Sequence, residues 1–369
     1  MADKQYLDHA KEILTSPYSS IKGNRKGSPI ISLMGGTDRY DLRDGFPLLT
    51  TKRIPSKSIF HELIWFLRGD TNIKYLEDNG VTIWRPNAFE NNLSAMVKEG
   101  IFSEGIKGIK YSPDWDNAVA EYGQRIREDS GFAERFGDAG PIYGAQWMRW
   151  QYFDVEKGEV VLVDQMGDMI ERMKKRPTSK RNMVTAWQPG DVARTSQPPC
   201  HVLIQPWVNE EGELDLQMYQ RSADWFLGIP FNIASYAALT QIIANETGLT
   251  PRSFVHGFGD AHIYAGLIKR GQWYREHLDE LRLRMKSIRE GDEGRYEELL
   301  MWVNSNAPKD DVEEQYDHVT ALIEQRSRKP KENLPTLKIA RKPHKQLTID
   351  DFVLEGYESH PAIKRKMAV

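Results

Sequence analysis

Cysteine is almost absent from this chain of 369 residues, since Cys200 is its single one. One thiol cannot form an internal disulfide or supply the several sulfur ligands of a multi-cysteine zinc or iron–sulfur site. So little cysteine is typical of a reducing compartment. The chain also lacks a run approaching the ~18 apolar residues of a membrane span and the apolar stretch of an N-terminal signal peptide. We therefore expect a soluble, intracellular, cytoplasmic protein.

An excess of one charge is missing as well. Fifty basic and 53 acidic side chains give a formal net charge of −3, which argues against a histone-like protein or an acidic tail. Hydrophobic residues make up 40% of the chain and aromatic residues 10%, enough for a large core and against extensive disorder. At roughly 150 residues per domain, the length allows two domains or one large α/β unit.

Apolar periodicity predicts a mixture of helices and strands. The predicted helices are residues 6–14, 56–67, 164–175 and 233–244, and the predicted strands are 30–33, the residues around Tyr40, 183–187, 200–208, 214–219, 254–258, 336–340 and 352–354. Because no regular βαβ repeat is visible, we expect an α+β domain built on a large sheet.

Two charged stretches, residues 88–139 and about 272–332, contain little turn-defining glycine and have helical periodicity. Neither carries a recognisable chemical motif. Surface helical insertions on one domain explain them better than independent modules do, so we expect a single domain over residues 1–369.

Cys200 is a candidate nucleophile. It follows Pro198-Pro199 and opens a predicted strand, so that a turn delivers its thiol at a strand end. A lone cysteine is more often an inert buried residue. However, Arg221 lies in the segment QRSAD at 220–224, and a guanidinium near the thiol would favour the thiolate.

Glu62 is a candidate for proton transfer. It lies on the apolar face of the predicted helix 56–67, three residues after Ile59 and four before Phe66. A carboxylate in this position must be paired or have a raised pKa, and a raised pKa suits proton transfer near neutrality. A structural glutamate satisfied by a lysine or by the backbone explains the pattern equally well.

The strongest basic cluster is KKRPTSKR at residues 174–181. A nucleic-acid patch is one interpretation, although the near-neutral chain argues against it and a solvated helix end is commoner. A third is a site for one phosphate group, which would combine Lys180 and Arg181 with the distant Arg25 and Arg221.

A short segment contains His256, Asp260, His262 and Tyr264. A tetrahedral metal site needs three or four convergent ligands, and a strand with side chains of alternating direction supplies too few. We therefore expect no metal here and, instead, hydrogen bonding to a sugar or polyol.

Many ordered motifs of the chain resemble those of the thymidylate synthases. They are DGFPLLTTK at 44–52, HELIWF at 61–66, GPIYG at 140–144, PPCHVL at 198–203, YQRSAD at 219–224, LGIPFNIASY at 227–236, GDAHIY at 259–264, EGY at 355–357, HP at 360–361 and MAV at 367–369. The resemblance is interrupted only by the two insertions. It implies a thymidylate synthase-like fold, in which a large mixed sheet forms the dimer interface and is covered by helices.

The resemblance also implies the activity: a homodimeric methyltransferase that converts dUMP to dTMP, with 5,10-methylenetetrahydrofolate as carbon donor and reductant and with no metal. Cys200 would add to carbon 6 of uracil and so make carbon 5 a nucleophile toward the folate methylene. Glu62 and Tyr143 would manage protons, with Arg221 and Asp224 completing the catalytic set.

The binding residues follow from the same resemblance. Asn232 would read the base, because its amide can donate to uracil O4 and accept from N3–H, whereas cytosine would leave a buried group unpaired at a cost of about 1–3 kcal/mol. The implied phosphate ligands are Arg25, Arg221 and Ser222, with Lys180 and Arg181 donated to the partner's site; the sugar ligands are His262 and Tyr264; the folate contacts are Ile83, Trp84, Asn87, Asp224, Gly228, Phe231 and Val369.

Three positions depart from the family pattern: Arg85 where an aspartate usually follows the tryptophan, Gln197 where a leucine usually precedes the Pro-Cys step, and Lys180 in place of an arginine. Arg85 and Gln197 lie at the expected folate side, where polar groups would admit water. This suggests an alternative, a dUMP or UMP 5-hydroxymethylase of the same superfamily, in which water replaces the hydride. Trp84 and the C-terminal MAV argue for a closed pocket and hence for the synthase.

A third alternative is a nucleotide- or RNA-binding protein that has the fold without turnover. It predicts loss of the nucleophile or of the carboxylate, and both Cys200 and Glu62 are present.

Overall fold

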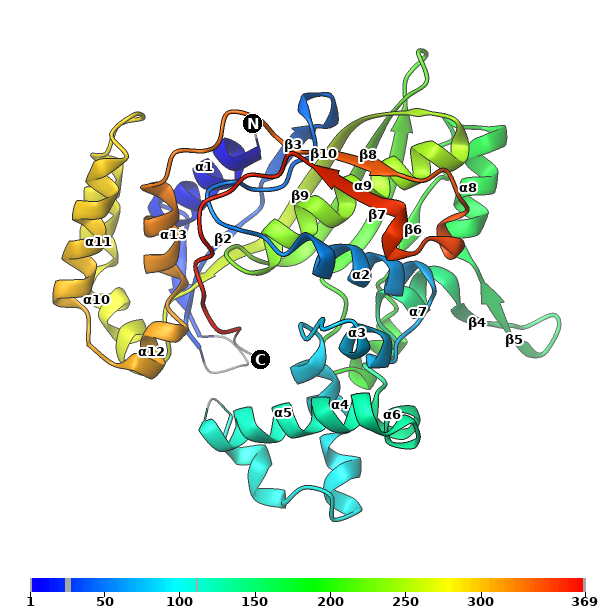
Figure 1. The fold of residues 1–369 in the computed structure, drawn as a ribbon, viewed down its shortest axis with the longest axis horizontal. Helices are drawn as coiled ribbons and strands as arrows, with labels where there is room; N and C mark the ends of the chain where they lie inside the picture. Colours follow the sequence, from blue (N-terminus) through cyan, green and yellow to red (C-terminus); the bar gives the residue numbers. More distant parts are fainter. Residues whose placement is uncertain (1, 24–27, 111, 368–369) are drawn as a thin grey trace.

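The computed structural model describes residues 2–23, 28–110 and 112–367, which form an α+β structure around one mixed sheet (Figure 1). The strand order is β1-β2-β9-β8-β7-β6, and β3 also pairs with β9. The strands are β1 Ser20–Lys22, β2 Ile30–Met34, β3 Thr37–Asp41, β6 Val184–Thr185, β7 His201–Val208, β8 Glu213–Asp224 and β9 Thr250–Tyr264. Only the β8–β9 pair of this described sheet is parallel. The predicted large mixed sheet is confirmed.

The central strand, β9, is longer than the sequence predicts. The prediction ends it at Phe258, but the strand continues through Gly259 to Tyr264. It pairs with β8 along one edge and with both β2 and β3 along the other. Ladder hydrogen bonds on both edges therefore keep a glycine in the strand, which local preference alone disfavours. Conversely, β6 is shorter than predicted because it is an edge strand that pairs through two residues only.

Two glycines allow β2 and β3 to follow each other along β9. Gly35 and Gly36 have φ values of +89° and +125°, a region that favours glycine. A Cβ atom at Gly36 would also lie 2.8 Å from Nε2 of His9. The chain can therefore turn here and still keep α1 (Ala2–Thr15) packed beside the sheet.

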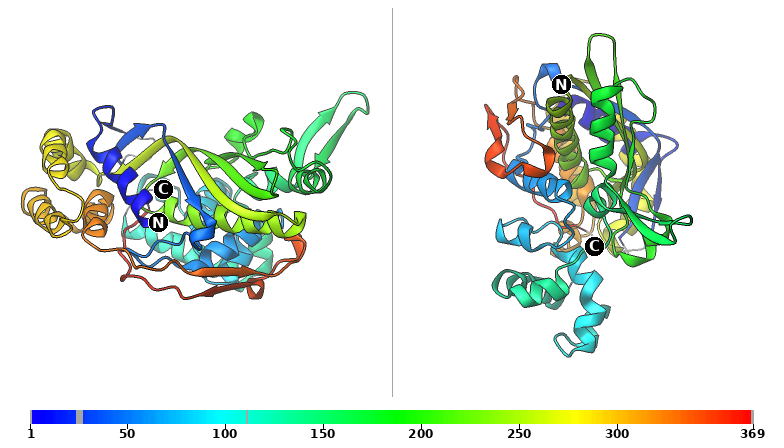
Figure 2. Two further views of the ribbon diagram at one scale, coloured as in Figure 1. Left: turned by 90° about the horizontal axis from the view of Figure 1, so that it is seen from above. Right: turned by 90° about the vertical axis from the view of Figure 1, so that its right-hand side faces the viewer.

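Helices cover one face of the sheet. α9 (Gly228–Thr247) packs on β8 and β9, and α2 (Ser56–Leu67) and α8 (Gln165–Lys175) pack on α9. Figure 2 (right) shows these helices gathered on one side of the strands. α2 begins and ends at the predicted residues, whereas α9 begins five residues before its predicted start. Pro230 fits there because the first turn of a helix does not need its N–H groups for intrahelical bonds.

The opposite face of β7 and β8 is partly bare. Leu216 and Met218 are fully buried, whereas the alternating Trp207 and Tyr219 are 55% and 38% exposed. Side chains alternate between the two faces of a strand, so the exposed set lies on the side away from α9. A sheet face with exposed aromatic residues is a candidate contact surface.

Both predicted insertions are helical. The first comprises α4 Arg85–Lys98, α5 Pro113–Glu128 and α6 Ser130–Phe136, and the second comprises α10 Ile268–Lys286, α11 Gly294–Asn306, α12 Asp311–Gln315 and α13 His318–Arg326. In Figure 1 the first lies at the bottom and the second at the left. Their buried residues, such as Phe89 and Tyr274, belong to the same continuous apolar core as α1 and α2.

Smaller elements complete the described chain. They are α3 Lys74–Asp78, α7 Tyr143–Met148, the hairpin β4 Trp150–Asp154 with β5 Glu159–Val163, the pair β10 Thr336–Ile339 with β11 Phe352–Glu355, and short 3₁₀ turns at Leu42–Asp44, Glu104–Gly108, Pro189–Arg194, His344–Gln346 and Ile349–Asp351. The sequence predicted the last strand pair but missed the β4–β5 hairpin, which projects at the right of Figure 1. None of the helices formed by the described residues has the length and apolar character needed to cross a membrane.

Asp3 fixes α1 to the segment that leads into α2. Its carboxylate is 1% exposed and accepts the N–H groups of Thr50 and Thr51, at 2.9 to 3.0 Å, and both hydroxyls. We expect Asp3→Asn to lower the free energy of unfolding by about 2–4 kcal/mol, because the amide group would leave buried donors unpaired. Urea denaturation measures this change.

The control is Asp8→Asn on the same helix. Asp8 is half exposed and pairs with Lys4 at 2.8 Å, so its substitution should cost less than about 1 kcal/mol. Equal losses for the two variants would contradict a structural role specific to Asp3.

Candidate active site

The Cys200 thiol lies at the end of a turn, directly before β7, and is partly exposed. The Cys200 N–H donates to the hydroxyl of Tyr143 on α7 at 2.7 Å. Gln197 Nε2 lies 3.5 Å from Sγ. The thiol is therefore accessible, while the backbone that carries it is held in place.

Arg221 on β8 holds this turn from the other side. Its side chain donates to the carbonyls of Pro199 and Pro198 at 2.9 and 2.7 Å, and its N–H donates to the Cys200 carbonyl at 2.9 Å. Its guanidinium also lies over the ring of Trp187, 5.1 Å from the centroid. The structure thus brings Arg221 beside the turn of Cys200, the candidate nucleophile, as the sequence motif suggested.

Glu62 is buried on α2, and its described partner is an indole. Oε1 accepts from Trp84 Nε1 at 2.6 Å. Burial raises the pKa of Glu62 to about 7, although the bond from Trp84 acts in the opposite direction. The sequence left open a structural glutamate paired with a lysine or with the backbone. The described partner is neither of these but the indole of Trp84. A carboxyl group with this pKa can hold or release a proton near neutrality.

Tyr143 connects the two groups. Its ring centroid is 5.9 Å from that of Trp84, and its hydroxyl accepts from the Cys200 N–H. Burial and the charge of Cys200 raise the pKa of Tyr143 well above its ordinary value. The nucleophile, the phenol and the buried carboxyl group therefore form one continuous cluster.

His201 follows the nucleophile, but it does not provide an imidazolium. Burial lowers the pKa of His201 to about 3, so the ring is neutral. It lies between Tyr143 and Tyr236, with centroid distances of 4.8 and 5.1 Å. The ring thus packs against the two tyrosines, while the described partners of Cys200 Sγ are Gln197 and the Pro198 carbonyl.

The Asn232 amide on α9 is oriented by residues that the sequence interpretation missed. Oδ1 of Asn232 accepts from Gln220 Nε2 at 3.0 Å, and Gln220 Oε1 lies 2.8 Å from His256 Nε2. His256 is fully buried, which lowers its pKa well below the ordinary value and keeps it neutral. Within the segment 256–264, His256 thus bonds Gln220 in the interior, and the sugar contact expected from this segment stays a prediction for His262 and Tyr264. Gln220 directly precedes Arg221 in the motif YQRSAD, and this position in the sequence could have identified it as a residue of the site.

Asp224 lies where β8 leads into α9. Its Oδ1 accepts the N–H groups of Phe226 and Leu227 at 3.2 Å and lies 3.7 Å from His318 Nδ1. Burial would raise the pKa of Asp224, but His318, His262 and the N–H of Leu227 together lower it. Asp224 is therefore ionised at neutral pH. His318 lies in the stretch 272–332, where the sequence showed no motif.

Gly228, His262 and Tyr264 lie close to Asp224. A Cβ atom at Gly228 would meet Asp224 Cβ at 3.6 Å and Asn232 Oδ1 at 3.7 Å. The rings of His262 and Tyr264 are 5.5 Å apart, and Tyr264 is 5.2 Å from His318. The structure thus brings the residues expected at the sugar and at the folate to one end of β8 and β9.

The remaining expected folate contacts follow the Trp84 segment and α9. Ile83 and Phe231 are half-buried, and Asn87 is buried with its carbonyl accepting from Ser196 Oγ at 2.9 Å. The sequence suggested that Arg85 would place a charge at the folate side, but the structure directs this side chain elsewhere. Its guanidinium forms two bonds to Glu77, at 2.7 and 2.6 Å.

The described part of the chain does not bring Lys180 and Arg181 to the other residues expected to bind the phosphate. Lys180 and Arg181 are exposed in the turn after α8, and no described contact joins them to the Cys200 cluster. Ser222 lies on β8, one residue from Arg221, where its carbonyl accepts from Gln220. Arg25 and Val369 lie outside the described residues.

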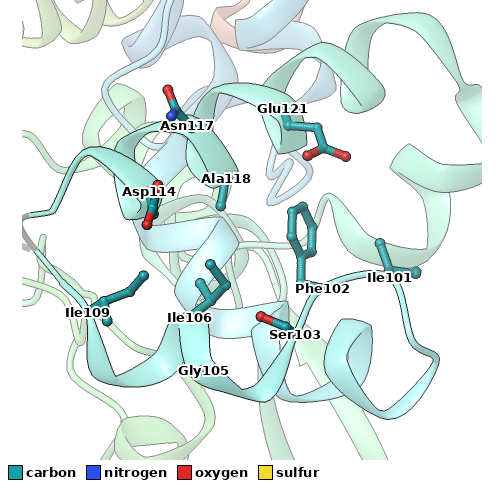
Figure 3. Close-up of a pocket in the computed structure, with 10 residues that line it drawn as sticks. All are labelled: Ile101, Phe102, Ser103, Gly105, Ile106, Ile109, Asp114, Asn117, Ala118 and Glu121. Carbon is teal, nitrogen blue, oxygen red and sulfur yellow. The ribbon is translucent and has the colours of Figure 1, made fainter.

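A separate groove of about 550 Å³ lies between residues 101–109 and α5 in the first insertion. Figure 3 shows its lining, which includes Phe102, Ile106 and Glu121 and none of the residues discussed above. Within the described part of the chain, no group of three or more histidine, cysteine or acidic side chains is placed to hold a metal ion.

Comparison with known proteins identifies relatives of this chain by sequence. The sequence profile of the family described as thymidylate synthase matches residues 4–369. The thymidylate synthase of Listeria monocytogenes serotype 4b (strain CLIP80459) is 38% identical over 99% of this chain and all of its own length. Those of Mesoplasma florum and Malacoplasma penetrans are 37% and 38% identical with the same coverage.

Glu62→Gln tests the burial of the carboxyl group. Folded Glu62 stays protonated up to about pH 7, whereas the unfolded chain ionises it near pH 4.5. As the pH rises through this window, only the unfolded chain can release the proton, so the unfolded state becomes more stable relative to the folded state and the free energy of unfolding falls. We expect Glu62→Gln to have a free energy of unfolding about 1–3 kcal/mol above that of the wild type at pH 8 and no advantage at pH 4.

Urea denaturation at the two pH values measures the effect. Glu99→Gln, which changes a carboxylate whose side chain is 40% exposed, is the matched control and should show no such window. A Glu62→Gln difference independent of pH would contradict the raised pKa.

Proposed function

Because the chain belongs to the thymidylate synthase family, we propose that it methylates dUMP to dTMP with 5,10-methylenetetrahydrofolate as carbon donor and hydride source. The observation that carries the proposal is the cluster in which Cys200, Tyr143, Trp84 and Glu62 connect an accessible thiol to a buried carboxyl group. An unreactive pyrimidine ring requires covalent activation and proton transfer within one site.

The first step is addition of the Cys200 thiolate to carbon 6 of the uracil. The electron pair of the 5,6 double bond moves toward carbon 5 and O4, forming an enolate. Arg221 holds the turn that presents the sulfur, and Asn232, oriented by Gln220, pairs with O4 and N3–H. The enolate carbon then attacks the methylene group of the folate, whose bond to N10 breaks while its bond to N5 is kept until the later elimination.

The remaining steps move one proton and one hydride. The proton on carbon 5 passes to Glu62 in its ionised form, with the neutral phenol of Tyr143 as a hydrogen-bonding group beside it, and elimination releases tetrahydrofolate from the new exocyclic methylene. A hydride from tetrahydrofolate reduces that methylene to methyl as the Cys200 sulfur leaves carbon 6. The products are dTMP and dihydrofolate, which balances the electrons.

The binding roles are proposed for the same residues. Arg25, Arg221 and Ser222 bind the phosphate, and His262 and Tyr264 bind the sugar. Ionised Asp224 accepts a hydrogen bond from the pterin, since His318 and His262 lower its pKa. The contacts proposed around the folate are Ile83, Trp84, Asn87, Gly228, Phe231 and Val369.

The active form that we propose is a cytoplasmic homodimer of single-domain subunits, which exchange Lys180 and Arg181. Two features support the dimer. First, the exposed Trp207 and Tyr219 lie on the partly bare face of the sheet. Second, Lys180 and Arg181, the basic residues proposed to bind the phosphate, have no described contact with Cys200 of their own chain. The main apolar core, which includes buried residues of α1, α2 and both insertions, supports the single domain over residues 1–369.

The hydroxymethylase alternative retains one supporting observation. Gln197 Nε2 lies 3.5 Å from Cys200 Sγ, so a polar group does reach the site. Arg85 gives it no support, because its charge is paired with Glu77. Trp84 is 8% exposed and bonded to Glu62, which favours a closed site and hence the hydride step.

A product assay tests the proposal. Purified protein is given dUMP and 5,10-methylenetetrahydrofolate, dihydrofolate is followed by absorbance, and the nucleotide is identified by mass. We expect equal amounts of dTMP and dihydrofolate, both abolished by Cys200→Ala. A 5-hydroxymethyl nucleotide without dihydrofolate would instead establish the alternative, and Gln197→Leu should then restore dTMP.

Subunit complementation tests the dimer. Cys200→Ala and Arg181→Ala should each inactivate the protein, but refolding them together would give heterodimers in which one of two sites is intact. Random pairing predicts about a quarter of the wild-type activity. Cys200→Ala with Glu62→Ala is the control, since these residues belong to the same subunit's site and leave no intact site. No recovery in the first mixture would contradict exchange of Arg181.

A further inference from the structure

A buried ionic cluster joins the first insertion to the segment that carries Trp84. Glu77 on α3 is 1% exposed and takes two bonds from Arg85, at 2.7 and 2.6 Å, and one from Arg127 of α5 at 2.9 Å. Gly123 of α5 lies against the Arg85 side chain, so that a Cβ atom there would collide with Nε and lie 2.7 Å from Cδ. We call Glu77, Arg85, Gly123 and Arg127 the Glu77 clamp.

The clamp acts at the start of α4, where two site elements are held. Trp84, directly before Arg85, donates to Glu62 at 2.6 Å. One turn later, the Asn87 carbonyl accepts from Ser196 Oγ at 2.9 Å, and Asn91 Oδ1 accepts from the Ser196 N–H at 3.2 Å. The same helix end therefore supports the buried carboxyl group and the turn before Cys200.

We propose that the Glu77 clamp makes Arg85 a positioning residue, which fixes the N-terminal end of α4 so that the first insertion sets the geometry of both Glu62 and the Cys200 turn. A bidentate arginine on a buried carboxylate defines both distance and direction. Removing Arg85 leaves the buried Glu77 carboxylate with the partly exposed Arg127 as its remaining described partner, so the direction that Arg85 defines is lost. The role of Arg85 in catalysis rests on the proposed function, but its effect on the Ser196 turn does not.

Gly123 gives an independent way to disturb the clamp. Alanine favours a helix over glycine, so Gly123→Ala by itself would stabilise α5. In the folded protein the added methyl group would occupy the position of the Arg85 side chain. Arg85→Gln and Gly123→Ala should therefore have the same consequence, and the double variant should be no worse than either single variant.

The first measurement is hydrogen exchange at the Ser196 amide, which needs no turnover. We expect both single variants and the double variant to exchange at least roughly tenfold faster than the wild type, because Asn91 no longer protects this N–H. Arg135→Gln is the matched control: it breaks an exposed ion pair with Glu99 in the same insertion and should leave the rate unchanged.

The second measurement is the pH profile of kcat. We expect kcat to fall roughly 10- to 100-fold with little change in the KM for dUMP. The hydrogen bond from Trp84 lowers the pKa of Glu62, so a variant that loses this bond should have the acid limb of its kcat profile at higher pH. Trp84→Phe, which removes the bond directly, is the reference variant and should show the same shift. The other titratable groups facing Glu62, Tyr143 and Tyr236, have pKa values well above the ordinary tyrosine value and do not titrate in this range.

The outcomes separate the two hypotheses. If the wild type makes no dTMP, the proposed function fails, while exchange at Ser196 still decides whether the clamp positions the turn. Exchange rates and acid limbs that match those of Arg135→Gln would overturn the clamp. So would effects of Arg85→Gln and Gly123→Ala that simply add, since the two residues would then act separately.

Discussion

The candidate site depends on a carboxyl group that is buried without a charged partner among the residues that the structure describes. Glu62 accepts one indole N–H on an otherwise apolar helix face, and its pKa of about 7 follows from this burial. An ion pair would have lowered the pKa and removed the group from proton transfer near neutrality. Trp84 and Tyr143 therefore contact the Glu62 region through packing and neutral hydrogen bonds, while the charged groups Arg221 and Glu77 act one contact further away.

The helical insertions reach this site through buried carboxylates. In the first, Glu77 binds Arg85 next to Trp84. In the second, fully buried Asp317 pairs with Arg270 and accepts from the hydroxyl of Tyr274, next to the His318 that faces Asp224. A buried ion pair adds little net stability but disfavours alternative arrangements. Each insertion is thereby connected to a residue of the site, although its remaining surface carries none of the site's chemistry.

The sheet separates two tasks. α9 covers one face and presents Asn232, while the ends of β8 and β9 bring Asp224 beside His262. On the other face, Trp207 and Tyr219 stay exposed. Alternation of side chains along a strand lets one pair of strands supply both surfaces.

The sequence alone determined the elements whose periodicity is strong and local. The helix at 56–67 was predicted to its ends because Ile59, Leu63 and Phe66 repeat at helical spacing, and the same pattern placed Glu62 among buried residues. Ordered motifs sufficed to predict the family and to name Cys200, Arg221 and Asn232. These features depend on near neighbours in the chain.

The tertiary structure decided which distant groups meet. Trp84 rather than a lysine satisfies Glu62, Arg85 turns to Glu77 and Gly123, His256 lies behind Gln220, and His318 comes from an insertion without a motif. β9 extends through Gly259 because strands on both edges hold it. Hydrogen-bond partners, burial and therefore pKa values are set by contacts between residues from eight to more than two hundred positions apart, and no local pattern of residues encodes them.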